Sequence, residues 1–283
     1  MKLATVLHAV LLGSNTIFAL RDDPTTDPPL PSIRRSRLSD GLKTLFFAHE
    51  DRDTTPPTVA YNQNCAGAVL TGAGYRSVTG TLQIPSIKLP PGANRDKLHA
   101  VSAWIGIDGE HACPNSMLQV GVDMYLNNSI SQYWAWFEWF PNHSTYLTDF
   151  AIRAGDTLTM NITAASLSSA EFAITNHRTG QRDSATLTDP AAAAAAAPLL
   201  CGFSTEWMVE DFSASDGVPL VDFGGVAFTG AQFATDSGVT GGVEAAEMAG
   251  VKETADGQVV IECEKVGGDE VTCLYRGDAG TNT

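Results

Sequence analysis

The sequence predicts an all-β protein, either a sandwich or a barrel, and three observations lead to that class. Short segments with alternating apolar and polar residues recur from Val59 onward, as expected for half-buried strands. Glycine, proline, asparagine and aspartate separate these segments, and no long amphipathic helical pattern occurs between them. Of the 283 residues, 43% are hydrophobic and 17% are charged, which excludes a disordered or coiled-coil chain.

Ten segments carry the strand pattern most clearly. In chain order they are Thr81–Ile84, Val101–Ile107, Met117–Leu126, Gln132–Phe140, Thr157–Thr163, Glu171–Thr175, Trp207–Phe212, Val226–Phe228, Val259–Lys265 and Glu270–Tyr275. Turn signals such as Pro90-Pro91-Gly92 and Gly224-Gly225 lie between them. The run Ala191–Ala197 precedes Pro198 and is too short to sustain a helix, so we interpret it as a low-complexity loop.

The N-terminal part predicts a targeting segment followed by a processed region. Leu3–Leu12 is apolar and follows Lys2, and it is long enough for a signal peptide but too short to span a bilayer. We therefore predict a signal peptide at 1–19, a propeptide or linker at 20–57, and one β-domain at 58–283. No later apolar stretch approaches about 18 residues, so we expect a secreted, extracellular protein without a membrane segment.

The net charge of −15 is concentrated in the predicted mature domain. Residues 1–56 carry seven basic and seven acidic side chains, whereas residues 57–283 carry ten and 25. This acidic balance argues against nucleic-acid binding and suits a protein that works in acid. A propeptide bound through its basic cluster Arg34–Arg37 would be released as carboxylates become protonated; the alternative is a tail without function.

The cysteines predict disulfides in a secreted chain, although connectivity does not follow from sequence alone. There are five, at Cys65, Cys113, Cys201, Cys263 and Cys273. A hairpin turn centred on Gly268 would place Cys263 directly opposite Cys273, which makes a cross-strand bridge geometrically reasonable. Cys113 and Cys201 would then form a long-range pair and Cys65 would remain as a buried thiol.

Strand parity gathers polar and aromatic residues on shared faces, because residues two and four apart point the same way. The groups are Trp104 with Asp108, Gln119 with Asp123, Trp134 and Trp136 with Glu138, and Glu206 with Glu210. Such faces could line an acidic, aromatic cleft, or could simply face solvent. The sequence contains neither a GxSxG nucleophile elbow nor an HExxH zinc motif.

Five ordered blocks resemble those of the glutamic peptidases, or eqolisins, which are secreted acid endopeptidases. They are Asn64–Val69, Ser102–Gly109, Leu118–Asp123, Ala135–Pro141 and Glu206–Phe212, with further matches at Val221–Gly224 and Val226–Thr229. The resemblance covers residues 60–275 and implies an antiparallel β-sandwich of two curved sheets, of the concanavalin-A-like or jelly-roll type. It also implies a Gln/Glu catalytic dyad that maps to Gln119 and Glu210, and it supports a Cys113–Cys201 bridge.

The chemistry implied by this resemblance is consistent with the residue types. Glu210 would accept a proton from water and return it to the leaving amine, while the Gln119 amide would stabilise the oxyanion. The cleft would be lined by Trp104, Asp108, Asp123, Trp136 and Glu138. We also hypothesise that Asp123 orients the Gln119 amide. No metal or organic cofactor is needed for these steps.

The expected partners are polypeptide substrates and the chain's own propeptide as an inhibitor, on a monomeric protein that binds neither nucleic acid nor membrane. Three sequons, beginning at Asn127, Asn142 and Asn161, fit a secreted glycoprotein. Cys65 replaces a tryptophan usual in the family, and Phe140 stands where a tyrosine is common.

Three alternatives from other classes remain at this stage. A lectin-like sandwich could bind sugars through its tryptophans. A glycosidase could use paired carboxylates such as Glu138 and Glu210. A relative without catalytic activity could retain the same fold.

Overall fold

The computed structural model describes residues 59–110, 112–188, 199–253 and 257–277. The predicted signal peptide, the propeptide and the alanine run lie outside these residues. Within the described part, no helix is long and apolar enough to cross a membrane.

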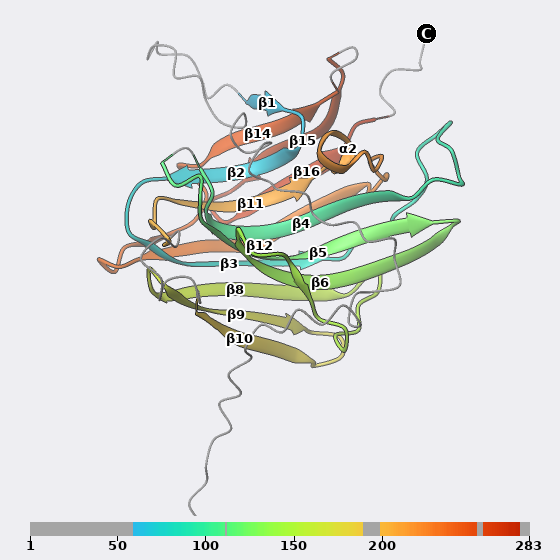
Figure 1. The fold of residues 1–283 in the computed structure, drawn as a ribbon. Coiled ribbons are helices and arrows are strands. Elements are labelled where there is room, and N and C mark those ends of the chain that lie inside the picture. Colours follow the sequence, from blue (N-terminus) through green and yellow to red (C-terminus); the bar gives the residue numbers. More distant parts are fainter. Residues whose placement is uncertain (1–58, 111, 189–198, 254–256, 278–283) are drawn as a thin grey trace, which may run out of the picture.

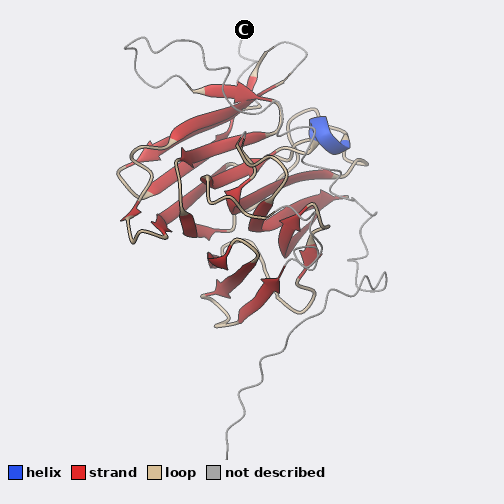
Figure 2. Cartoon of the chain, turned by 60° about the vertical axis from the view of Figure 1, so that its left-hand side comes forward, coloured by secondary structure: helices blue, strands red, loops and turns tan. Residues whose placement is uncertain are grey.

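Sixteen strands and one short helix make up the described chain (Figures 1 and 2). In order they are β1 (Ala60–Asn62), β2 (Cys65–Thr71), β3 (Tyr75–Gln83), β4 (His99–Asp108), β5 (Met117–Asn127), β6 (Ile130–Phe140), β7 (Thr145–Tyr146), β8 (Thr157–Ser166), β9 (Ser169–Asn176), β10 (Arg182–Thr188), β11 (Ser204–Glu210), α2 (Ser213–Asp216), β12 (Gly225–Thr235), β13 (Thr240–Gly241), β14 (Glu247–Lys252), β15 (Val259–Val266) and β16 (Glu270–Tyr275). Each of the ten predicted segments has a strand counterpart.

Hydrogen bonding runs through the strands in the continuous order β10-β9-β8-β3-β12-β16-β15-β14-β2-β11-β4-β5-β6-β7. Every neighbouring pair in this order is antiparallel. In Figure 1, β8, β9 and β10 lie at the bottom of the view, and β14 and β15, from the middle of this order, lie near the top. The predicted sandwich is therefore confirmed, but its two layers belong to one hydrogen-bonded sheet that folds over itself.

Contacts between the layers build the core. The Trp207 indole of β11 donates a hydrogen bond of 2.8 Å to the carbonyl oxygen of Thr79 on β3. Phe137 of β6 stacks on Phe172 of β9 with ring centroids 4.1 Å apart. These contacts place β11, β4, β5 and β6 against β3, β8 and β9, and the buried apolar side chains of both layers fill the space between them.

Burial patterns distinguish the two layers. The strand β8 alternates buried and partly exposed residues, as expected when one face is packed and the other meets water. In contrast, every residue of β4 is buried, so both of its faces are covered. The strands at the centre of the second layer therefore present a second buried face, opposite the sandwich core.

Both predicted disulfides are present. Cys263 and Cys273 lie directly opposite each other on β15 and β16, whose register is symmetric about Gly268 as predicted, and they form a disulfide. Cys113 and Cys201 form the long-range bridge, and Cys65 is buried and takes part in neither disulfide. The long-range bridge ties the start of β11 to the segment after β4.

Candidate active site

Except for Asp108, the residues grouped by strand parity lie in three neighbouring rows across β11, β4, β5 and β6. The rows are Glu206–Gly106–Gln119–Glu138, Met208–Trp104–Gly121–Trp136 and Glu210–Ser102–Asp123–Trp134. Their alternate neighbours, such as Trp207 and Ile105, belong to the sandwich core. The rows therefore occupy the face of the second layer that points away from that core, and the structure brings the predicted residues of all four strands together.

This face is closed to water over most of its area. Gln119 and Asp123 are fully buried, and only 3% of the surface of Glu210 is accessible to solvent. The face carries its own apolar cluster, separate from the sandwich core, formed by Cys65, Val69, Trp104, Met117, Trp136, Met208 and Ala249. The alternative of a plain solvent-facing sheet surface is therefore wrong, and carboxylates here lie in an environment of low polarity.

The Glu210 carboxylate is oriented by an indole. The Nε1–H group of Trp104 donates a hydrogen bond of 3.1 Å to Oε2 of Glu210, and both side chains are buried. Gly121 makes this arrangement possible, because a Cβ atom there would lie 2.5 Å from Cβ of Trp104 and 2.8 Å from Cζ2 of Trp136. The glycine thus leaves room for two indoles to pack over the centre of the sheet.

The Gln119 amide is fully buried, yet neither its oxygen nor its nitrogen has a hydrogen-bond partner among the described residues. An unpaired buried amide costs roughly 1–3 kcal/mol, so such groups are uncommon and call for an explanation. A carbonyl oxygen of a bound substrate would accept an N–H bond that the protein itself leaves open.

Asp123 does not contact the Gln119 amide, contrary to the hypothesis from the sequence, and its carboxylate is engaged by other groups. Its carboxylate instead accepts hydroxyl bonds from Ser102 at 2.7 Å, from Tyr125 at 2.9 Å and from Tyr146 at 2.6 Å. Ser102 lies directly opposite Glu210 in the sheet. Asp123 therefore supports the strand position beside Glu210.

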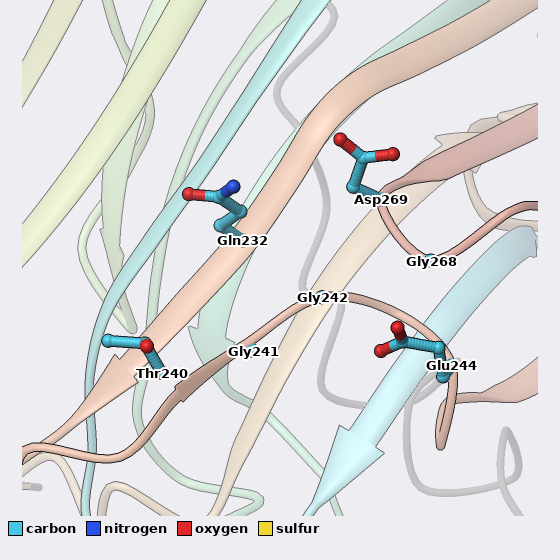
Figure 3. Close-up of a pocket in the computed structure, with 7 residues that line it drawn as sticks. All are labelled: Gln232, Thr240, Gly241, Gly242, Glu244, Gly268 and Asp269. Carbon is cyan, nitrogen blue, oxygen red and sulfur yellow. The ribbon is translucent and has the colours of Figure 1, made fainter.

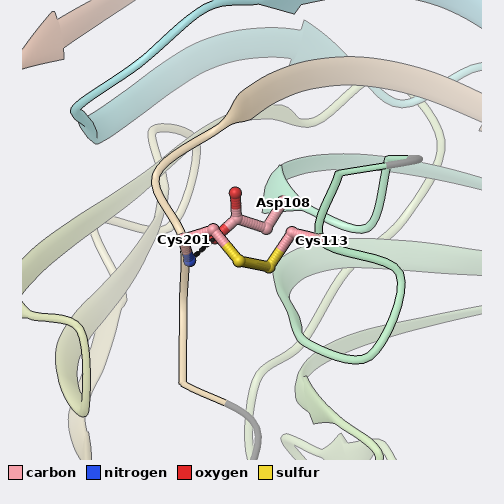
Figure 4. Close-up of side chains that lie close together, drawn as sticks. All are labelled: Asp108, Cys113 and Cys201. Atoms are coloured by element: carbon pink, nitrogen blue, oxygen red, sulfur yellow. Dashed lines mark hydrogen bonds between the residues drawn. A yellow bond between two sulfur atoms is a disulfide. The ribbon is translucent and has the colours of Figure 1, made fainter.

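Asp108 also has a different role from cleft lining. Its carboxylate accepts backbone N–H bonds from the consecutive residues Cys201, Gly202, Phe203 and Ser204, at 2.6, 2.9, 2.7 and 3.4 Å. Figure 4 shows this carboxylate beside the Cys113–Cys201 bridge. Asp108 has a left-handed backbone with φ of 68°, which turns the chain at the end of β4. Carboxylate and disulfide together hold the start of β11, the strand that carries Glu210.

Two further carboxyls on or next to β11 have raised pKa values. Burial raises the pKa of Glu206 well above its ordinary value; the nearby Ser204 hydroxyl opposes this, and the charges of Glu110 and Asp108 add to it. Burial likewise raises the pKa of Asp211 to about 6, although hydrogen bonds from Ser213 act in the other direction. These groups hold their protons in acid more strongly than ordinary carboxyls.

Sequence reasoning missed several members of this site. Ser144 donates a hydrogen bond to Glu138, which lies directly opposite Gln119. Tyr125 and Tyr146 reach Asp123 from two different strands. Ser102 lies within a block already singled out, and strand pairing was the signal needed to place it opposite Glu210. No sequence pattern pointed to the short strand that carries Tyr146.

The sequence profile described as the peptidase A4 family matches residues 63–275. Aspergillopepsin-2 of Aspergillus niger is 35% identical over 306 aligned positions, which cover 97% of this chain and 100% of the relative. Scytalidopepsin B of Scytalidium lignicola is 30% identical, covering 86% of this chain and 87% of the relative.

The chain belongs to the peptidase A4 family. Solved eqolisin structures agree with this assignment. The crystal structure of scytalido-glutamic peptidase with a peptide-based transition-state analogue has a TM-score of 0.63 at 30% identity, covering 76% of this chain and 98% of that one. Aspergilloglutamic peptidase from Aspergillus niger has a TM-score of 0.55 at 36% identity, covering 63% and 99%. The prediction of an acid-active glutamic endopeptidase is confirmed at this level.

Family membership favours the peptidase over the lectin and glycosidase alternatives. The departures in this eqolisin lie on the active face: Cys65 is directly opposite Glu210, and Phe140 packs against the apolar cluster. Cys65 thus places a small side chain beside Glu210 at a position where the family usually has an indole.

A separate pocket of about 340 Å³ lies away from the three rows. Figure 3 shows its lining residues, which are Gln232, Thr240, Gly241, Gly242, Glu244, Gly268 and Asp269. None of these residues belongs to the rows around Glu210. Among the described residues, Asp108, Cys113 and Cys201 lie close enough together to suggest a metal site, but the two sulfur atoms are bonded to each other.

Proposed function

We propose that this eqolisin hydrolyses peptide bonds with Glu210 as general base and acid and with Gln119 as the oxyanion donor. One observation carries the proposal. A carboxylate oriented by the Trp104 indole and a buried amide without a protein partner lie on the same closed face of the sheet. These are the two groups that acyl transfer to water requires.

The reaction proceeds in two steps with these groups. Ionised Glu210 removes a proton from a water molecule while the water oxygen attacks the scissile carbonyl carbon, and the carbonyl oxygen becomes an oxyanion. An N–H group of Gln119 donates a hydrogen bond to that oxyanion. Because the amide does not ionise, this donor is available at every pH. The protonated Glu210 then gives its proton to the leaving nitrogen, the C–N bond breaks, and a carboxylic acid and an amine are released.

The remaining predicted residues support these steps in different ways. Trp104 orients Glu210, and Trp136 packs beside it over Gly121. Glu138 lies directly opposite Gln119 in the same row, and we assign it to contact with the polypeptide. Asp123 and Asp108 hold backbone and hydroxyl groups, so they stabilise the site without touching substrate.

The processing history is part of the proposal. The apolar run after Lys2 and the basic cluster Arg34–Arg37 indicate secretion as a zymogen whose propeptide binds an acidic domain through charge. Acidification would neutralise carboxylates of that domain and weaken the interaction. We expect a monomeric enzyme that uses no cofactor.

The test is hydrolysis of a denatured protein between pH 2 and 7, with the wild type beside Glu210→Gln and Gln119→Leu. We expect acid-range cleavage that resists pepstatin and falls by at least about 100-fold in both variants, in line with the loss of a base or an oxyanion donor. Glu171→Gln on the exposed side of β9 is the matched control and should retain activity. Cleavage by Glu210→Gln at the wild-type rate would overturn the proposal, and no cleavage by the wild type after acid treatment would indicate an inactive relative.

A further inference from the structure

A glycine separates two buried polar side chains in the first row of the active face. Glu206 lies opposite Gly106 on one side, and Gln119 lies opposite the same glycine on the other. A Cβ atom at Gly106 would lie 3.0 Å from Oε2 of Glu206, so this carboxyl extends over the glycine in the direction of β5. Cε of Met117 and Cζ3 of Trp104 would lie 3.1 Å from the same Cβ atom, so the Glu206 carboxyl reaches the strand position next to Gln119 in the company of two apolar groups.

Both groups are closed off from water and have no partner of normal geometry. Only 2% of the surface of Glu206 is accessible to solvent, and Gln119 is fully buried. No described residue forms a hydrogen bond of normal geometry with either Glu206 oxygen or with either amide atom of Gln119. An unpaired buried group costs roughly 1–3 kcal/mol. The nearby Ser204 hydroxyl can offset this cost for Glu206 only, whereas a contact between Glu206 and Gln119, directly or through one water molecule, would offset it for both groups.

The protonation state of Glu206 decides which end of the amide it contacts. An ionised carboxylate only accepts hydrogen bonds, so it would attract the Nε2–H groups of Gln119 and remove donors from the oxyanion. A neutral carboxyl donates its O–H to Oε1 and leaves an N–H group of the amide directed at the substrate. The two orientations differ by rotation of the amide, which a glutamine side chain makes readily.

The surroundings of Glu206 favour the neutral form. The titratable groups around it are Glu210 on its own strand, Asp108 and Glu110 at the end of β4, Glu138 on β6, Glu247 on β14 and Tyr75 on β3. The facing positions on β2 and β5, Val69 and Gln119, do not titrate. Five of the six groups are carboxyls, and burial together with neighbouring charge raises the pKa of Glu206 well above its ordinary value.

We propose that Glu206, in its protonated form, is the positioning residue that orients the Gln119 amide for catalysis. Its O–H group donates to Oε1 of Gln119, directly or through one water molecule, and ionisation of Glu206 reverses the amide and ends activity at higher pH. The inference rests on the proposed role of Gln119 and adds the group that makes that role depend on pH.

The experiment compares kcat and KM of Glu206→Gln and Glu206→Leu with the wild type on one fluorogenic peptide between pH 2 and 7. The glutamine variant keeps a neutral donor at every pH, so we expect kcat within about threefold of the wild type and a loss of activity that begins at least one pH unit higher. The leucine variant removes the donor, so we expect kcat to fall at least about tenfold with KM within about twofold.

Several outcomes would overturn this inference. They are a wild-type kcat for Glu206→Leu, an unmoved alkaline limit for Glu206→Gln, or failure of Glu206→Gln to fold, because a neutral isostere should be tolerated where the acid is neutral. If only Glu206→Leu fails to fold, the pH profile of Glu206→Gln decides. An inactive Glu210→Gln beside a fully active Glu206→Leu would refute the positioning role alone, whereas an active Glu210→Gln would refute the proposed dyad itself.

Discussion

Asp211 should make the folded domain more stable in acid than at neutral pH. This carboxyl is 3% exposed, and burial raises its pKa from 3.8 to about 6. Because the folded-state pKa is the higher one, the favourable contribution is complete below pH 3.8 and is lost as the pH rises through 6. At ~1.4 kcal/mol per pH unit, the difference amounts to about 3 kcal/mol in the free energy of unfolding.

Asp211→Asn isolates this contribution. Ser213 donates its N–H and its hydroxyl to the two carboxylate oxygens, each at 2.8 Å. The asparagine oxygen can accept the N–H bond, and its amide can donate to the hydroxyl, so the variant imitates the protonated acid. We therefore expect it to unfold like the wild type at pH 3 and to be up to about 3 kcal/mol more stable at pH 7.

Urea unfolding at pH 3, 5 and 7 measures the effect, in a Glu210→Gln background that suppresses self-digestion. The exposed Asp269→Asn is the matched control and should change stability by less than about 0.5 kcal/mol at every pH. Equal destabilisation by Asp211→Asn at pH 3 and pH 7 would refute the reasoning, because it would show that hydrogen-bond geometry matters and desolvation of the charge does not.

Three other substitutions test the framework of the domain. Asp156→Asn should lower the free energy of unfolding by about 1–2 kcal/mol near pH 6, measured by urea unfolding, because the hydrogen bond from Arg178 holds the pKa of Asp156 at about 2. The stabilisation by the ionised carboxylate is lost only as the pH falls from 3.8 through 2, so an equal loss of stability in the variant at pH 1 would contradict this explanation. Asp108→Asn places an amide against backbone donors, and we expect a lower thermal midpoint with about tenfold lower kcat, whereas unchanged activity would remove its role in holding β11. Gly121→Ala should destabilise the domain by at least about 2 kcal/mol and abolish cleavage, since its methyl group would lie 2.5 Å from Cβ of Trp104; a stable, active variant would show that the indoles can move apart.

The sequence was sufficient for the strands with regular alternation. All ten predicted segments became strands, because a period of two is a local property that survives in any packing. It failed to identify β1, β2, β7, β10, β13 and β14. The strands β2 and β14 are short, nearly continuous buried runs with little alternation, β1, β7 and β13 span only two or three residues, and β10 alternates in burial but carries few apolar side chains. The Cys263–Cys273 bridge was predictable because its hairpin is local.

For the site, local order in the sequence determined which residue types share a face, and resemblance to a family determined which glutamine and glutamate to consider. Only the tertiary structure decided what each group contacts. Asp108 and Asp123 were expected to line a cleft. Instead, Asp108 accepts hydrogen bonds from the backbone that begins at Cys201, and Asp123 accepts a hydrogen bond from the hydroxyl of Tyr146 on another strand. Hydrogen-bond partners of this kind come from distant positions in the chain, so no local pattern encodes them.

The burial of Glu206 and Glu210 could not be predicted from the sequence. The order Glu206-Trp207-Met208-Val209-Glu210 shows by itself that the two glutamates point the same way. It does not show that the face they occupy is covered, that an indole from β4 reaches Glu210, or that Glu206 faces an unpaired amide across Gly106. Desolvation depends on every atom that excludes water around a group, and those atoms are assembled only when the sheet folds over and its strands come into register.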